Sequence, residues 1–70
     1  MTLTQKDVDN IHELEAYLKK DARTVGEMAT HLNVTRLQAL DYLEIMSKNP
    51  KRYRLATGDL GGQEKKWLIE

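Results

Sequence analysis

The chain contains no cysteine, so neither a disulfide nor a thiolate metal site supports its fold. A reducing compartment fits this composition. Residues 1–5 lack the basic flank and apolar run of a signal peptide, and no stretch approaches the roughly 18 apolar residues of a membrane span. We therefore expect a cytoplasmic protein without a membrane partner.

Material for a second domain is also lacking. A chain of 70 residues is short enough to bury only about 60% of the surface that its unfolded form exposes, which leaves room for one core. Hydrophobic residues make up 40% of the chain and charged residues 31%, a balance typical of globular domains. The expected organisation is a single domain over residues 1–70.

The formal net charge is zero, because the chain has 11 basic and 11 acidic residues. Strong nucleic-acid binders usually carry a basic surplus. The two parts of the chain nevertheless differ. Residues 1–47 hold five basic and eight acidic residues, whereas residues 48–70 hold six basic and three acidic residues. The positive charge is thus concentrated in the C-terminal part.

Apolar residues recurring at steps of three and four predict three amphipathic helices, none with an internal proline, at about 4–20, 24–32 and 35–48. A threonine precedes each helix and can cap its first amides: Thr4, Thr24 and Thr35. Glu27 and Gln38 follow the last two at the capping-box spacing. The three helices therefore have matching start signals.

Asn33 is expected to end the second helix, since asparagine enters the left-handed region at low cost. Pro50 excludes the preceding residue from helical geometry and ends the third helix. Leu40 is assigned to the apolar stripe of the third helix. The predicted core consists of Val8, Ile11, Leu14, Leu18, Val25, Met28, Ala29, Leu32, Ala39, Leu43 and Met46.

From Tyr53 the apolar period changes to two, and a glycine-rich stretch at 58–62 precedes a return segment at 65–69. This pattern predicts a β-hairpin over 53–69. Trp67 is interpreted as a cover for the core, with a stacking platform for bases as the alternative.

The predicted elements follow one another as a helix, a pair of capped helices and a hairpin. The helix pair contains Ala29, the turn residues 32–34, and Thr35 and Arg36 at the start of the third helix. In these features the chain resembles the winged helix-turn-helix family of DNA-binding domains. The resemblance implies an α+β fold and a transcriptional regulator of double-stranded DNA, with the third helix in the major groove and the hairpin, or wing, on the backbone.

Carried onto this sequence, the resemblance implies that Arg36 pairs with a guanine edge and Gln38 with an adenine edge. It also implies phosphate contacts by the hydroxyls of Thr24, Thr35 and Tyr42. The cations that would release counterions from the backbone are Lys48, Lys51, Arg52, Arg54, Lys65 and Lys66. For the last two, a solvated strand edge that discourages aggregation is an equal alternative.

The outer face of the third helix departs from this family pattern, because it carries Leu37, Asp41, Glu44 and Ile45. Carboxylates that face phosphates would repel them. The alternative function is therefore a protein-protein interaction module that binds a partner through Leu37, Asp41 and Ile45 without recognising DNA.

No enzymatic or metal chemistry is expected. His12 and His31 have no second histidine at three or four residues and no cysteine nearby, so metal binding is not predicted. The stretch 58–62 lacks the lysine and hydroxyl ending of a phosphate-binding loop, and no activated nucleophile stands out. We expect no cofactor. Because no long helix follows the hairpin, a monomer or a weak homodimer through the first helix or the wing is predicted.

Overall fold

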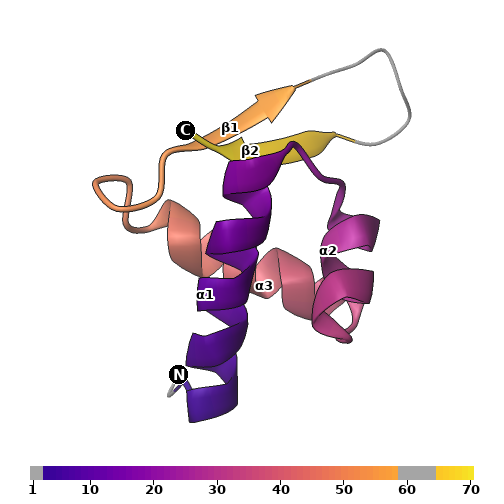
Figure 1. The fold of residues 1–70 in the computed structure, drawn as a ribbon. Coiled ribbons are helices and arrows are strands. Elements are labelled where there is room, and N and C mark those ends of the chain that lie inside the picture. The colour runs from indigo at the N-terminus through magenta and orange to yellow at the C-terminus, as the bar shows by residue number, and fades with distance from the viewer. Residues whose placement is uncertain (1–2, 59–64) are drawn as a thin grey trace.

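The computed structural model describes residues 3–58 and 65–70 of the chain. Its elements are the helices α1 (Gln5–Lys20), α2 (Val25–Leu32) and α3 (Arg36–Ser47) and the strands β1 (Leu55–Gly58) and β2 (Lys66–Ile69). Figure 1 shows the hairpin lying across the C-terminal end of α1, with α2 and α3 beside that helix. The predicted α+β architecture with winged-helix topology is confirmed. Most of the glycine-rich stretch expected at 58–62 lies outside the described residues.

Each helix begins at the threonine that the sequence indicated. The Oγ1 atom of Thr4 accepts a hydrogen bond from the Asp7 amide at 3.1 Å, and Asp7 accepts one from the Thr4 amide at 3.0 Å. Thr24 and Glu27 form the same reciprocal pair at the start of α2. Thr35 accepts from the Gln38 amide at 3.1 Å. These bonds satisfy amides that have no partner within the helix.

The turn between α2 and α3 is built on Asn33, whose φ of 57° and ψ of 48° place it in the left-handed region. Its amide donates to the carbonyls of Ala29 and Thr30, and the Val34 amide donates to the Ala29 carbonyl at 3.0 Å. The backbone therefore leaves α2 abruptly and enters α3 after two more residues. The predicted helix break at Asn33 is confirmed.

The core lies between the three helices and the hairpin. The buried hydrophobic side chains are those of Ile11, Leu14, Leu18, Met28, Ala29, Leu32, Ala39, Tyr42, Leu43, Met46, Tyr53 and Ile69. Of the predicted core residues, only Val8 and Val25 are half-buried. The assignment of Leu40 to the apolar stripe of α3 is wrong, because Leu40 is 48% exposed. It lies beside the stripe on a flank that none of the other described elements covers fully.

The hairpin is antiparallel, with Leu55 opposite Ile69 and Thr57 opposite Trp67. β1 begins two residues later than predicted, because the Tyr53 amide donates to the Asn49 carbonyl at 3.0 Å and closes a turn. One pairing was not predicted. Arg23, between α1 and α2, exchanges two backbone hydrogen bonds with Trp67, at 2.8 and 2.7 Å. These bonds attach the link between the first two helices to the free edge of β2.

Within the described part of the chain, no helix has both the length and the apolar composition needed to span a bilayer.

Candidate binding surface

The start of α3 presents the residues that the sequence assigned to base and phosphate recognition. Thr35 and Arg36 are exposed, and Gln38 is half-buried. The Oγ1 atom of Thr35 accepts a hydrogen bond from the Gln38 amide, so this hydroxyl caps the start of α3 whatever else it contacts. Three of the predicted contact residues thus gather at one end of the helix.

Tyr42 does not share that surface. Its side chain is only 1% exposed, and its hydroxyl donates to Asp7 Oδ1 at 2.8 Å and accepts from Asn10 Nδ2 at 3.1 Å. Burial raises the pKa of Tyr42, so the hydroxyl keeps its proton and remains a donor. The expected phosphate contact is replaced by a structural one, in which Tyr42 fastens α3 to the first turns of α1.

The outer face of α3 is apolar and acidic. Leu37 is 71% exposed and Leu40 is 48% exposed, and their spacing of three residues makes them neighbours on the helix surface. Glu44 is exposed and lies 3.8 Å from the ammonium of Lys48, and Asp41 is half-buried. Ile45, which the sequence grouped with this face, is half-buried and packs against the core. Leu37 is therefore the most accessible apolar side chain of α3.

A groove of about 210 Å³ runs along one flank of α3, between this helix and β2. Val25, Leu40 and Trp67 supply its apolar surface, and Arg36 and Lys65 supply two positive charges. Trp67 is half-buried and packs against the core, which confirms its predicted role as a cover, while its remaining surface lines the groove. The sequence did not indicate this groove, because its residues come from three separate elements.

Other predicted cations lie beyond the opposite end of α3. Lys48, Lys51, Arg52 and Arg54 are exposed in the segment that joins α3 to β1. Arg52 lies 3.7 Å from Glu15 of α1 and also stands over the ring of Tyr53. Because the 12 residues of α3 rise about 18 Å in total, these cations are well separated from Arg36 at the start of the helix. Between the two basic groups lies the acidic and apolar outer face.

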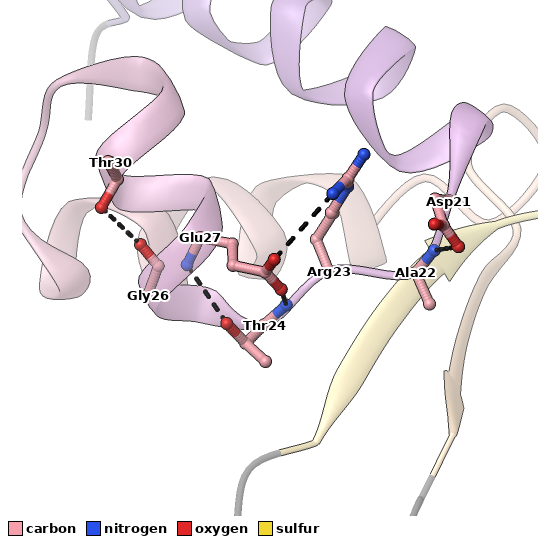
Figure 2. A network of polar contacts seen from close by, with 7 residues as sticks. All are labelled: Asp21, Ala22, Arg23, Thr24, Gly26, Glu27 and Thr30. Atoms are coloured by element: carbon pink, nitrogen blue, oxygen red, sulfur yellow. Dashed lines mark hydrogen bonds and ion pairs between the residues drawn. The ribbon is translucent and has the colours of Figure 1, made fainter.

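Thr24 belongs to the polar network at the start of α2 that Figure 2 shows. The Thr24 amide donates to Glu27 at 2.9 Å, and the Glu27 amide donates to the Thr24 hydroxyl at 3.2 Å. The backbone amide of Thr24 is the largest cause that lowers the pKa of Glu27, and Lys66 of β2 is a minor one. Thr24 is half-buried, and both its amide and its hydroxyl take part in the cap of α2. Lys66 is close enough to lower the pKa of the Glu27 carboxylate as well.

His12 lies on α1, and His31 lies on α2 against α1. The ring of His31 stacks on Tyr17 with centroids 3.9 Å apart, and its Nε2 atom lies 3.4 Å from Glu13. His12 is exposed. Among residues 3–58 and 65–70, no group of three or more histidine, cysteine or acidic side chains is placed to hold a metal ion. The His31 contacts join α2 to α1.

Comparison with protein-family models, with curated proteins and with solved structures found no match to this chain.

Proposed function

We propose that this domain is a winged-helix interaction module that binds a partner protein through the outer face of α3. The observation that carries the proposal is the 71% exposure of Leu37, next to Leu40 at 48%. Complete burial of one leucine side chain contributes roughly 1.5–3 kcal/mol. Two neighbouring leucines at the centre of a contact therefore supply a useful part of a binding free energy, provided that a partner covers both.

The charges of α3 favour protein over DNA as the ligand of this face. When a recognition helix enters the major groove, its outer face lies between the two phosphate backbones that border the groove. Glu44 is exposed on that face and Asp41 is half-buried beside it, so both carboxylates would lie in the negative field of the backbone. A protein partner can instead offer apolar surface to the leucines and a polar or basic rim to the carboxylates.

The test is quantitative affinity capture from the source cells with the immobilised domain, comparing the wild type with Leu37→Glu. The matched control is Lys20→Glu, which changes an exposed residue at the end of α1. We expect at least one protein to be retained by the wild type and the control and lost with Leu37→Glu. Retention that is equal with all three baits would contradict the proposal.

DNA binding is the second candidate, and the basic C-terminal part of the chain favours it. Exposed cations follow α3 at 48–54, and Lys65 stands beside Arg36 at the groove. Under this proposal the domain is a transcriptional regulator, with Arg36 and Gln38 on base edges and with Thr24, Thr35 and the cations on the phosphates. A surface of this kind binds mainly through counterion release, so its affinity falls steeply with salt.

Fluorescence anisotropy with a labelled duplex, from low to moderate salt, separates the two candidates. DNA binding would weaken at least tenfold when Lys65→Glu and Lys66→Glu are combined, and would survive Leu37→Ser, which adds no charge to α3. If the wild type binds no duplex even at low salt, the DNA proposal fails and the protein proposal is unaffected.

A further inference from the structure

The outer edge of β1 is the unpaired edge of the hairpin. In Figure 1, β2 lies against the end of α1, and β1 forms the far side of the hairpin. The outer edge of β2 is occupied, because Arg23 exchanges two backbone hydrogen bonds with Trp67. In the described part of the chain, no strand or bridge pairs with the outer edge of β1. Residues 55–58 also carry no charge and no proline, two features that commonly protect exposed strand edges.

The backbone groups on this edge belong to Leu55 and Thr57. Thr57 lies opposite Trp67 in the hairpin. Because Trp67 directs its amide and its carbonyl to Arg23, away from β1, the alternation of an antiparallel ladder directs those of Thr57 away from β2. The same alternation applies to Leu55, two residues earlier. Each of these two residues therefore offers one donor and one acceptor on the edge.

These groups are self-complementary when two copies of β1 run antiparallel about a twofold axis at Ala56. In that register Leu55 of each copy lies opposite Thr57 of the other, so each pair exchanges backbone hydrogen bonds and no outward group is left over. A register centred on Leu55 would need the Tyr53 amide, which already donates to the Asn49 carbonyl. A register centred on Thr57 would place Leu55 beyond the end of the other copy's β1.

The side chains of the hairpin's outer face fit the same register. Ile69 is buried in the core, so its neighbour Leu68 points to the opposite face, where Ala56 lies beside it. Pairing two hairpins would align Leu68 and Ala56 with their two counterparts in one apolar row. Arg54 of each copy would lie opposite Gly58 of the other, which keeps the two guanidinium-bearing positions roughly 13 Å apart along the strands.

We propose that a second copy of this chain pairs with the outer edge of β1 and forms one continuous antiparallel sheet centred on Ala56. This surface is separate from the outer face of α3, so the proposal does not depend on the proposed function. Strands of four residues make a small contact, whereas stable interfaces bury roughly 1,200–2,000 Å². We therefore expect a dimer that forms at high protein concentration and dissociates on dilution.

Charge variants at Ala56 test the register. Like charges that lie directly opposite each other on neighbouring strands repel, and opposite charges attract. In sedimentation equilibrium of the full chain, Ala56→Lys and Ala56→Glu should each weaken self-association at least tenfold, and their equimolar mixture should recover it. Leu37→Ser changes an exposed residue of α3 and is the matched control, which should dimerise like the wild type. Far-ultraviolet circular dichroism of each variant checks that the fold is kept.

Disulfide formation gives an independent measurement, because the chain has no cysteine. The two Ala56 residues would form a pair without mutual hydrogen bonds, in which the Cα atoms lie about 4.5 Å apart, within the range of a disulfide. Under the same mild oxidant, Ala56→Cys should form a covalent dimer at least tenfold faster than Thr57→Cys. Greater accessibility would favour the opposite order, since Thr57 is exposed and Ala56 is half-buried.

Three outcomes would overturn the inference: a wild type that remains monomeric at millimolar concentration, a mixture of charge variants that associates no better than each variant alone, or equal crosslinking of the two cysteine variants. If the amides of Leu55 and Thr57 gain protection from hydrogen exchange only when another protein is added, the edge binds a foreign strand and self-pairing is wrong. None of these results affects capture that depends on Leu37, so this inference and the proposed function fail separately.

Discussion

The inner and outer faces of α3 are both rich in large apolar residues, yet they have opposite environments. Leu43 is 4% exposed and contributes to the core, whereas Leu37, on the same helix, is 71% exposed. Single exposed leucines are ordinary in folded proteins. Leu37, however, adjoins Leu40, which lines an apolar groove, so the outer face continues into a second apolar surface. The difference teaches that an apolar residue of α3 is not always a core residue, and the exposed leucines form the surface that we propose binds a partner.

The sharpest way to test this comparison is to truncate the same residue type on each face. Leu43→Ala should lower the free energy of unfolding by about 2–5 kcal/mol, because it removes packed methyl groups and leaves a cavity. Leu37→Ala should change it by no more than about 0.5 kcal/mol, since the side chain is exposed and alanine is an excellent helix former. Urea denaturation of both variants measures the two values. Equal losses would mean that Leu37 is packed.

A smaller effect is expected at the turn that decides which face of α3 points inward. Asn33 has a φ of 57°, a conformation that costs an ordinary L residue roughly 1–2 kcal/mol. Asn33→Ala should therefore lower the free energy of unfolding by about 1 kcal/mol, and Asn33→Gly by less than about 0.5 kcal/mol. Urea midpoints give both numbers. A glycine variant less stable than the alanine variant would show that the backbone conformation is not the cause.

A comparable or slightly smaller loss is expected for Tyr42→Phe, which tests how the inner face is attached to α1. The change removes one hydroxyl that joins Asp7 and Asn10, so we expect a loss of about 1 kcal/mol in the free energy of unfolding. The same change should raise the pKa of Asp7 towards its ordinary value, because the Tyr42 hydroxyl is one of the groups that lower it. NMR titration of Asp7 provides this readout. A pKa for Asp7 that stays the same in the variant would contradict the bond.

The smallest effect concerns the acidic residues that cap the starts of α1 and α2, Asp7 and Glu27. The amide of Thr4 lowers the pKa of Asp7 below 3.8, and the amide of Thr24 lowers that of Glu27 below 4.5. A lowered folded-state pKa contributes stability that is present above the ordinary value and lost as the pH falls through the folded value. The urea concentration at the unfolding midpoint should therefore decrease as the pH is lowered below about 4.5. The decrease should be smaller for Asp7→Asn and for Glu27→Gln than for the wild type. Unchanged pH dependence in both variants would rule out this origin.

Local chemistry made several parts of this protein predictable from the sequence. Thr4, Thr24 and Thr35 begin the helices because their side-chain oxygens satisfy nearby amides, and Asn33 ends α2 because its side chain tolerates a positive φ. The change of period at Tyr53 indicated the hairpin. Each of these signals acts over a few residues, so the order of elements can be read without knowing how they pack.

Tertiary packing alone decided how the residues of the site are distributed. The sequence assigns Leu40 to the apolar stripe and Tyr42 to a phosphate contact, but α1 holds the buried Tyr42 hydroxyl, and none of the described elements fully covers Leu40. Trp67 joins Arg23 and lines a groove with Leu40, and these contacts bridge separations that no local period records. The physical reason is that helical spacing fixes which side chains share a face, whereas burial depends on what the rest of the chain places against that face.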